Sequence, residues 1–468
     1  MMRAFSLAEA RDWLGANLGG SPVNAGDVRF SDVGTDTRSV HPGQLFVALR
    51  GERFDGHRFL ADAQAAGAVA AVVEQEDTSV DMPQLVVADT VQALAQLAAG
   101  NRNESSAELI AITGSSGKTT VRQMAGAILA RMGSALSTEG NLNNHIGVPL
   151  TLFRLTPEHQ FGAIELGASG LGEIAHTVAI VKPVVSVLTN AGQAHLEGFG
   201  SYQNIVQAKG EIIDGVQGGG SVVLNRDDPA FEQWRQRAGA RKVISVSRMA
   251  HPEADYRAEI LNRSDVGLEL AIAGPDGWQC QLHLPMPGDH NASNALMAIA
   301  ACRVLGATDQ QVQEGLSGVQ AVKGRLQIHR LSDRLTVIDD SYNANPSSVK
   351  AAIDVLAAYA GQRVVVLGSM AELGADGPAL HQDVGHHARN AGIERLLTVG
   401  TGGQDYAAGF GPGAECFEQH DQAVEAVIQA LGQAPMPMVV LIKGSRSSAM
   451  ERVVEGIQKK VTNACCSG

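Results

Sequence analysis

The chain has 468 residues, which is enough for about three domains of ordinary size, each with its own hydrophobic core. Its 49 acidic and 36 basic side chains give a net charge of −13, so a non-specific grip on nucleic acid or on an anionic membrane is excluded as its main function. A composition of 44% hydrophobic residues, 18% charged residues and 53 glycines excludes a disordered or fibrous protein and is typical of a turn-rich globular one.

Targeting and disulfide signals are weak in this sequence. The segment MMRAFSLAEARDWLG at 1–15 is interrupted by charges before an apolar signal core can form, and the longest small apolar run, at 65–73, is about half a membrane span. The five cysteines form no CxxC pair and no zinc-like spacing, which favours a reducing compartment. We therefore expect a cytoplasmic protein, with Cys465 and Cys466 in a terminal tail at 463–468.

The first two domains are predicted at 1–87 and 88–322. The opening region has its own short strands, in LFVALRG and AAVVEQ. The second region begins with the strand ELIAIT and the helical stretch KTTVRQMAGAILARM, and strands follow in FGAIELGAS, PVVSVLTNAG and GSVVLNRDD. Short apolar strands that alternate with helices predict a parallel sheet covered on both faces.

A second strand and helix series begins after Gly324 and predicts a third domain at 323–462. Strands are expected in RLTVIDD, RVVVLGSM, RLLTVG and PMVVLIK, with helices over 347–360 and near 381–391. The predicted fold is therefore an α/β protein of three domains. The central one is a P-loop ATPase domain with a parallel sheet, and the C-terminal one is a Rossmann-like α/β domain.

The strongest motif is Gly114–Thr120, with the sequence GSSGKTT, between a predicted strand and a predicted helix. Its glycines let successive backbone N–H groups face a phosphate, the helix N-terminus favours an anion, and Lys118 adds a positive charge. The Thr119 hydroxyl is in the position expected to bind Mg²⁺. The strict motif has glycine where this chain has Ile112, so the loop is a variant. A tight turn that happens to carry a lysine is the alternative.

Three further side chains carry a weaker signal when each is taken alone. Glu165 ends a predicted strand at the sheet edge where α/β folds bind ligands, and a carboxylate there suits Mg²⁺. His195 lies in the glycine-flanked loop AGQAHLEGFGS, and Lys209 follows in VQAKGEIID. A histidine in a loop and a lysine on a helix are usually surface residues. Their combination with the P-loop is what makes them candidates.

A series of segments, in chain order, resembles the Mur ligases of peptidoglycan synthesis, and among these the MurF type. They are TGSSGKTT, IELGAS, TNAGQAHLEGFGS, QAKGEI, PGDHNASNALMA, KGRL, DDSYNANPSS, GSMAELG and KGSR. The resemblance runs from DTRSVHPGQLFVALRGERFDGHRF at 36–59 to KGSR at 443–446, which is most of the chain. It implies an ATP-dependent ligase that joins D-alanyl-D-alanine to UDP-N-acetylmuramoyl-tripeptide, and it suggests a monomer.

In this family the γ-phosphate of ATP moves to the substrate carboxylate, and an amine then attacks the acyl phosphate. The resemblance implies that Lys118 contacts the β- and γ-phosphates, that Thr119 and Glu165 hold one Mg²⁺, and that His195 helps to hold a second. Lys209 is expected to be carbamylated, because CO₂ would convert its cation into an anionic oxygen ligand. An unmodified Lys209 paired with Glu211 or with a phosphate is the alternative.

The resemblance also implies which residues bind the nucleotide and the substrates. The implied ATP-binding residues are Gly114, Ser115, Ser116, Gly117, Lys118, Thr119, Thr120, Asn291, Asn294, Arg325 and Asp340. The incoming dipeptide is expected between the second and third domains, against Asn141, Asn143, Asn144, Tyr342, Asn343, Asn345, Lys443 and Arg446. The uridine diphosphate is expected in the first domain, against Asp36, Thr37, Arg38, Gly56 and His57.

Simpler structural roles are the alternatives for several of these residues. Asn291 and Asn294 are also suited to capping a helix. Arg325 and Asp340 are also suited to buried ion pairs, and Asn-rich loops are often only turns. The alternative functions are another amide ligase of the same superfamily, which adds one amino acid to a muramoyl peptide or glutamate to folate, and a P-loop ATPase switch.

Overall fold

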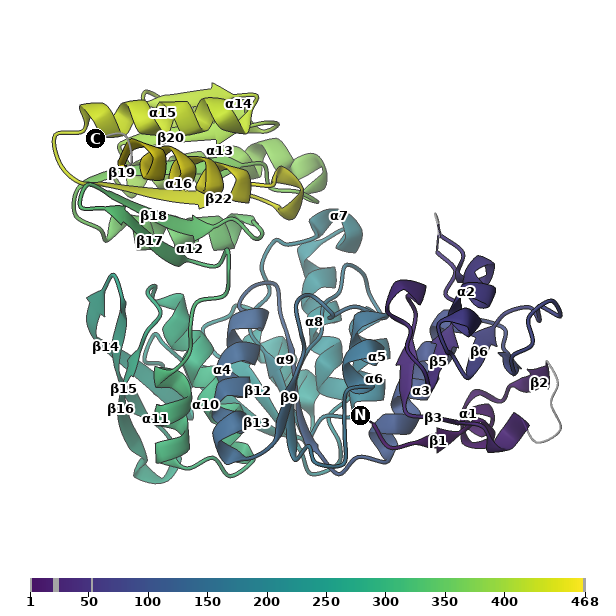
Figure 1. The fold of residues 1–468 in the computed structure, drawn as a ribbon. Coiled ribbons are helices and arrows are strands. Elements are labelled where there is room, and N and C mark those ends of the chain that lie inside the picture. The colour runs from purple at the N-terminus through teal and green to yellow at the C-terminus, as the bar shows by residue number, and fades with distance from the viewer. Residues whose placement is uncertain (1, 20–24, 52–53, 466–468) are drawn as a thin grey trace.

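The computed structural model describes residues 2–19, 25–51 and 54–465, and it confirms the predicted α/β fold with three domains (Figure 1). The N-terminal domain lies beside the central domain, and the C-terminal domain lies above the central one. Within the described residues, no helix is both long and apolar enough to cross a membrane.

The N-terminal domain is built on a five-stranded sheet, with a small β1–β3 ribbon beside it. The sheet order is β2 (Asn17–Gly19), β7 (Gln84–Val86), β6 (Ala70–Val73), β5 (Gln44–Val47) and β4 (Asp32–Gly34). The ribbon pairs β1 (Phe5–Ser6) with β3 (Arg29–Phe30). The helices are α1 (Leu7–Leu14) and α2 (Leu60–Ala65). Every residue of β5 and β6 is buried, as expected of short apolar runs in a parallel sheet. Helix α3 (Thr90–Asn103) packs on both α1 and the central domain.

The central domain contains a nine-stranded sheet. Its order is β16 (Gln279–Leu284), β15 (Gly267–Ala273), β14 (Tyr256–Ser264), β13 (Lys242–Ser247), β12 (Ser221–Asn225), β11 (Val185–Leu188), β8 (Glu108–Thr113), β10 (Phe161–Glu165) and β9 (Ala135–Ser137). The strands from β9 to β14 are parallel, as predicted, whereas β15 and β16 are antiparallel additions.

Helices cover both faces of this sheet. They are α4 (Lys118–Met132), α5 (Gly147–Leu152), α6 (Glu173–Val181), α7 (Leu196–Phe199), α8 (Tyr202–Asp214), α9 (Phe231–Ala238), α10 (His290–Val304) and α11 (Asp309–Ser317). Alternate residues of β8 enter different cores: Leu109 packs with residues of α5, α6 and α8, and Ile110 packs with residues of α4 and α10. A strand buried on both faces explains why ELIAIT is apolar almost throughout.

The C-terminal domain contains a six-stranded sheet between two helical layers. The order is β17 (Gln327–Ser332), β18 (Leu335–Asp340), β22 (Met438–Lys443), β19 (Gln362–Gly368), β20 (Arg395–Val399) and β21 (Ala414–Phe417), of which only β17 is antiparallel to its neighbour. The helices are α12 (Pro346–Ala357), α13 (Gly377–Asn390), α14 (Gly403–Phe410), α15 (His420–Gln433) and α16 (Glu451–Cys465).

The end of the chain differs in part from the predicted tail. Helix α16 continues through Cys465, so residues 463–465 form its last turn. Cys466 and the two residues after it lie outside the described residues. Cys280 and Cys302 are buried free thiols, and Cys416 is an exposed one.

Candidate active site

A cavity of about 850 Å³ lies between the central and C-terminal domains. The P-loop forms one wall, α10 and the residues after Gly324 form another, and the ends of β18 and β22 close it from the C-terminal domain. The predicted site residues that line it are Ser115, Ser116, Gly117, Lys118, Thr119, Thr120, His195, Asn291, Asn294, Arg325, Asp340, Tyr342, Asn343, Asn345, Lys443 and Arg446. A cavity of this size can hold a nucleotide.

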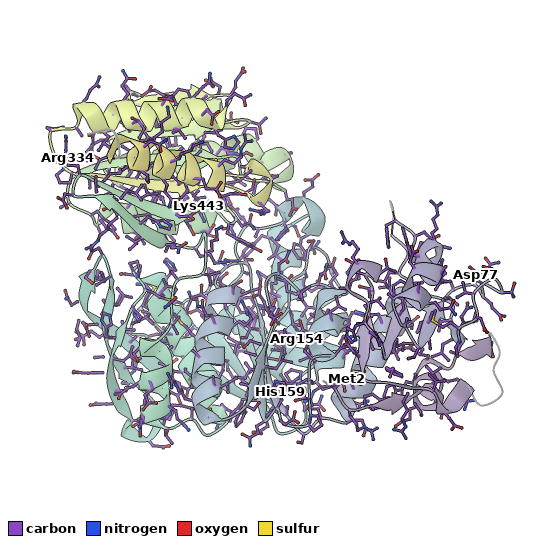
Figure 2. All side chains as sticks on the ribbon, in the orientation of Figure 1. Met2, Asp77, Arg154, His159, Arg334 and Lys443 are labelled. Carbon is purple, nitrogen blue, oxygen red and sulfur yellow. The ribbon has the colours of Figure 1, made fainter. Side chains whose placement is uncertain are left out.

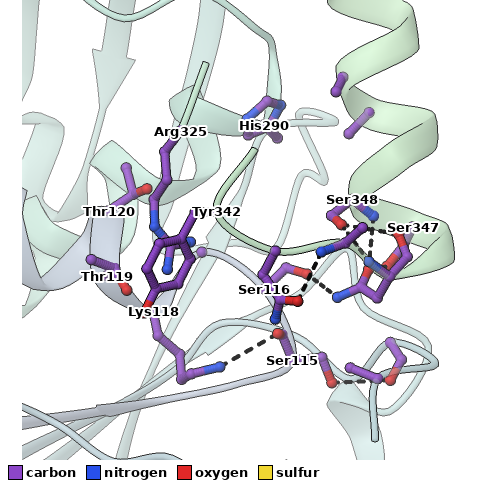
Figure 3. Close-up of a pocket in the computed structure, with 18 of the residues that line it drawn as sticks. Ser115, Ser116, Lys118, Thr119, Thr120, His290, Arg325, Tyr342, Ser347 and Ser348 are labelled. Atoms are coloured by element: carbon purple, nitrogen blue, oxygen red, sulfur yellow. Dashed lines mark hydrogen bonds between the residues drawn. The ribbon is translucent and has the colours of Figure 1, made fainter. Parts of the chain in front are cut away.

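The P-loop connects β8 to α4, and Lys118 is the first helical residue (Figure 3). The Lys118 ammonium donates to the carbonyl of Gly114 at 2.7 Å, so it folds back over the loop. Burial lowers the pKa of Lys118, nearby Glu165 works against that shift, and Arg325 adds to it. Two cations that face one cavity create a strongly positive site, which favours a polyanion such as a triphosphate.

Gly117 allows the loop to approach α10 closely. Its φ of +81° is in the left-handed region, and a Cβ there would lie 2.6 Å from Oδ1 of Asn294. Asn294 donates to Oδ1 of Asn291 at 3.0 Å, and Asn291 donates to the carbonyl of Pro287 at 2.7 Å. The helix begins at His290, and its N-cap, Asp289, makes no side-chain capping bond. Asn294 therefore packs against the P-loop and is held by Asn291. The alternative that these two asparagines cap helix α10 is wrong.

Arg325 reaches the cavity from the connection between the two domains. Its guanidinium stacks over the Tyr342 ring, 4.5 Å from the ring centroid, and its Nε is buried with no hydrogen-bond partner among the described residues. A buried N–H without an acceptor is costly, and an incoming anion would satisfy it. The buried ion pair considered for Arg325 is therefore not its arrangement in this structure.

Asp340 and Lys443 form a buried ion pair at the ends of neighbouring parallel strands. Lys443 donates to Oδ2 of Asp340 at 2.6 Å and to the carbonyl of Asn343 at 2.8 Å. Oδ1 of Asp340 accepts from the backbone N–H of Leu326 at 3.1 Å. Figure 2 shows Lys443 near the side of the C-terminal domain that is turned toward the central domain. Lys443 was predicted to contact the incoming dipeptide, and in this structure its ammonium is already paired with Asp340.

Glu165 ends β10 below the P-loop and is 3% exposed. Its carboxylate accepts from Arg122 at 3.2 Å and from Asn143 at 2.8 Å. Neither contact was predicted. Arg122, on α4, was not a candidate site residue, and Asn143 was expected to contact the dipeptide. Asn143 therefore orients Glu165, whereas Oδ1 of Asn144 accepts the backbone N–H of Gly147 at 2.8 Å and shapes a turn. Asn141, Asn143 and Asn144 do not line the cavity.

Lys209 lies on α8, is 1% exposed and has an unusual environment for a lysine. Its ammonium donates to the carbonyl of Ala168 at 3.2 Å and lies 5.0 Å from the centroid of the Phe199 ring. Burial, with a smaller contribution from Lys118, lowers the pKa of Lys209 to about 7. The carboxylate of Glu211 instead accepts the backbone N–H groups of Gly172 and Ala175. The alternative of a Lys209–Glu211 ion pair is wrong.

His195 meets the C-terminal domain directly. It precedes α7, with a φ of +56°, and its Nδ1 forms a hydrogen bond with Oε2 of Glu372. Asn345, the N-cap of α12, donates to the hydroxyl of Ser116 at 3.1 Å. These contacts join the C-terminal domain to the P-loop wall. Sequence reasoning missed Glu372, and it also missed His290, which lines the cavity beside the predicted asparagines.

Three family models match the chain in order. They are the Mur ligase catalytic domain over residues 29–102, the Mur ligase middle domain over 112–302, and the Mur ligase glutamate ligase domain over 324–446. A relative from Escherichia coli strain K12, named UDP-N-acetylmuramoyl-tripeptide–D-alanyl-D-alanine ligase, is 42% identical over 98% of this chain and 100% of its own length. The chain belongs to the Mur ligase family.

Solved structures support the same assignment. A crystal structure of MurF from Acinetobacter baumannii has a TM-score of 0.92 at 33% identity, and the match covers 98% of this chain and 99% of that one. MurF from Thermotoga maritima, in complex with ADP, has a TM-score of 0.83 at 26% identity over 92% of this chain and 98% of that one. These Mur ligases share the whole three-domain arrangement with the chain.

The predicted metal ligands of this Mur ligase supply only part of a coordination shell. The described residues contain no cluster of three or more His, Cys, Asp and Glu side chains that could hold a metal ion. Thr119 and His195 line the cavity, and Glu165 is buried below it. This combination of hydroxyl, imidazole and carboxylate fits a cation such as Mg²⁺ that takes its other ligands from phosphates, rather than one caged by protein alone.

The residues of the first domain that were predicted to bind uridine diphosphate make different kinds of contact in this Mur ligase. Asp36 accepts from the backbone and side chain of Arg38, whose bonds lower the pKa of Asp36 to about 2, and Arg38 is 88% exposed. Thr37 begins the short turn that Asp36 caps. His57 bonds through Nδ1 to Asp55 and through Nε2 to the backbone N–H of Glu74, so both ring nitrogens are already used. Gly56 is required because a Cβ would lie 2.9 Å from the backbone of Leu49.

Proposed function

We propose that this chain is an ATP-dependent ligase that joins D-alanyl-D-alanine to UDP-N-acetylmuramoyl-tripeptide, the last cytoplasmic step in making the muramoyl-pentapeptide precursor of peptidoglycan. The observation that carries the proposal is the full-length match, at 42% identity, to a relative with this name. A P-loop alone could equally belong to an ATPase switch. The positively charged cavity that the P-loop shares with the C-terminal domain therefore gives further support to the proposal.

In the first step, an oxygen of the substrate's terminal carboxylate attacks the γ-phosphorus of ATP. The bond from that phosphorus to the bridging oxygen breaks, ADP leaves and an acyl phosphate forms. Negative charge spreads over the transferring phosphoryl group, and the cations of Lys118 and Arg325 stabilise it from two sides of the cavity. The unpartnered Nε of Arg325 is the donor that such a group would satisfy.

In the second step, the dipeptide amine attacks the acyl carbon. The tetrahedral intermediate collapses, the carbon–oxygen bond to phosphate breaks, and inorganic phosphate leaves as the nitrogen loses its proton. An acyl phosphate is hydrolysed if water reaches it, so the contacts between Asn345 and Ser116, and between Glu372 and His195, serve the reaction by keeping the domains together. Tyr342, Asn343 and Arg446 are proposed to contact the dipeptide from the C-terminal wall.

Two Mg²⁺ ions, when bound, would neutralise phosphate charge during the transfer. Thr119 and Glu165 are proposed to hold one ion, and His195 and a carbamylated Lys209 the other. The surroundings of Lys209 support the modification, because a buried amine with a pKa near 7 is substantially neutral at physiological pH, and only the neutral amine adds CO₂. Asp36, Thr37 and Arg38 are proposed to contact the uridine diphosphate, with the enzyme acting as a monomer.

The test of the function is phosphate release from ATP and Mg²⁺ in the presence of both substrates, with each component omitted in turn and the product weighed by mass spectrometry. The proposal predicts release only in the complete mixture, and a product heavier by one dipeptide less water. Release without the dipeptide would indicate a switch. Release with a single amino acid, or with folate and glutamate, would indicate another ligase of the superfamily.

The carbamate has its own test in the variant Lys209→Ala. Its activity is expected to be lost and then partly restored by acetate or formate, because a small carboxylate can occupy the place of the carbamate. Lys182, a half-buried lysine that bonds to Asn103, supplies the matched control, and Lys182→Ala should keep full activity with no response to added carboxylate. If Lys209→Ala stays inactive at every carboxylate concentration while remaining folded, the carbamate is refuted.

A further inference from the structure

The motif GSMAELG follows β19 and reaches across to the central domain through one residue, Glu372. Its carboxylate forms a hydrogen bond with Nδ1 of His195. Its backbone carbonyl accepts the N–H of Glu197, on α7, at 3.0 Å. A Cβ at Gly374 would be in ordinary van der Waals contact with Glu197, at 3.9 Å from its backbone, so the same loop lies beside α7. The side chain and backbone of one residue thus both bond across the domain boundary.

The C-terminal domain holds this loop rigidly. Met370 and Leu373 on either side of Glu372 are each 4% exposed. The N–H of Met370 donates to Nε2 of His381 at 3.0 Å, and Nδ1 of that buried ring bonds to the carbonyl of Gly377 at 2.6 Å. The position of Glu372 is therefore set by the core of its own domain, and it moves with that domain.

Backbone strain is concentrated at the same contact. Glu372 has a φ of +61° and His195 a φ of +56°, and neither is a glycine. Left-handed backbone is unfavourable at such residues and persists where surrounding contacts impose it, often at functional sites. Here the two strained residues are bonded to each other across the domain boundary.

Helix α7 connects this contact to the rest of the site. A Cβ at Gly198 would lie 2.4 Å from the carbonyl of Ser169, so the helix is pressed against the loop that follows β10 and Glu165. Phe199, at the other end of α7, covers the Lys209 ammonium at 5.0 Å. Helix α7 is therefore capped by one proposed metal ligand, His195, and covers another, Lys209.

We propose that Glu372 is a positioning residue that completes the metal site only when the C-terminal domain is closed on the central domain. An ionised carboxylate can only accept, so Nδ1 of His195 carries the proton and Nε2 keeps its lone pair for a cation. The backbone bond to Glu197 fixes α7 at the same time. Closure of the domain thus both excludes water and orients the imidazole. This inference rests on the proposed function and adds a residue to it.

The experiment compares the binding of Mn²⁺, in the presence of ADP, to the full chain and to three variants, by electron paramagnetic resonance. Glu372→Ala removes the carboxylate and keeps the backbone carbonyl. Glu372→Gln keeps an acceptor of the same length. Asp376→Ala is the matched control, because this exposed carboxylate is in the same connection and makes no side-chain capping bond. Peptide substrates are absent, so the result does not depend on which acceptor the enzyme uses.

The proposal predicts that Glu372→Ala weakens Mn²⁺ binding about 10- to 100-fold, the range found when a carboxylate that orients a metal-binding histidine is removed. Glu372→Gln should lie between this variant and wild type, and Asp376→Ala should match wild type. The Glu372 side chain is 53% exposed, so all variants are expected to have the melting temperature of the wild type. Unchanged affinity in Glu372→Ala, or equal weakening in Asp376→Ala, would overturn the proposal. A wild-type chain that makes no product would instead refute the proposed function.

Discussion

The ion pair between Lys443 and Asp340 allows a quantitative test of how much a buried contact at the cavity stabilises the C-terminal domain. Replacing Lys443 with methionine keeps the length of the side chain and removes its charge. The side chains of Lys443 and Asp340 are only 3% and 11% exposed, although both line the cavity, so water replaces the lost partner poorly. Asp340 would then keep one hydrogen bond, from Leu326, and the carbonyl of Asn343 would lose its donor. Removing one partner of a buried pair costs about 3–5 kcal/mol, so we expect a loss of this size.

Native-state hydrogen exchange of β18 and β22 is a suitable assay, because it reports the stability of this domain separately from the other two. A loss of 3–5 kcal/mol corresponds to exchange that is roughly 150- to 5,000-fold faster. The double variant Lys443→Met, Asp340→Asn should recover at least half of the loss, since an amide oxygen still accepts from Leu326 without a buried charge. A single-variant loss below about 1 kcal/mol, or no recovery in the double variant, would refute this reasoning.

Three further predictions test other parts of the structure. Gly117→Ala should destabilise the chain by about 2–3 kcal/mol in urea unfolding, through left-handed strain and the contact with Asn294; if adding Asn294→Ala relieves nothing, the contact is unimportant. Arg325→Ala should lower kcat/KM for ATP about 10- to 150-fold in steady-state assays, because a charged donor to phosphate is lost, and an unchanged value would contradict that role. Burial lowers the pKa of His159, whose Nδ1 accepts from Thr156. Because the folded pKa lies below the unfolded value of 6.5, the stability that His159 contributes is present above pH 6.5 and is lost as pH falls from there through the folded pKa. Unfolding free energies of wild type and His159→Gln should therefore converge as the pH falls, and parallel curves would contradict the assignment.

The parts of the site that follow a strand could be predicted from the sequence. The P-loop follows β8, Glu165 is the last residue of β10 and His195 follows β11, and these three are neighbouring parallel strands. Their carboxyl ends meet at one edge of the sheet, so local strand patterns are enough to place these residues near one another. The buried strands β5 and β6 were identifiable from their apolar residues, which are LFV at 45–47 and AAVV at 70–73.

The partners of these residues could not be predicted in the same way. Arg122 bonds to Glu165 and Glu372 bonds to His195, and each pair joins elements that only the folded chain brings together. A single sequence shows neither the angle between two domains nor which side chain of a loop faces inward. The role of His57 is a similar case, because one of its two hydrogen bonds comes from the backbone N–H of Glu74, which lies just after β6 and 17 residues further along the chain.

The antiparallel extension of the central sheet, β15 and β16, has a signal that was not used. Residues of β16 alternate regularly between exposed and buried, as expected of a strand with one face on the core and one in solvent. This period of two differs from the continuous apolar runs of the parallel strands. Strands β8, β10, β11 and β12 were therefore predicted, whereas the parallel strands β9 and β13 and the antiparallel extension were missed.

The central claim is that a carboxylate is activated by phosphoryl transfer before the amide forms, and an isotope experiment tests it most directly. The tripeptide substrate is labelled with oxygen-18 in its terminal carboxylate, and the phosphate released with ATP and D-alanyl-D-alanine is analysed by mass spectrometry. The account predicts that one labelled oxygen appears in each phosphate, because the carboxylate oxygen that attacks phosphorus leaves with it. Phosphate without the label, in a reaction that yields the peptide product, would contradict the acyl phosphate.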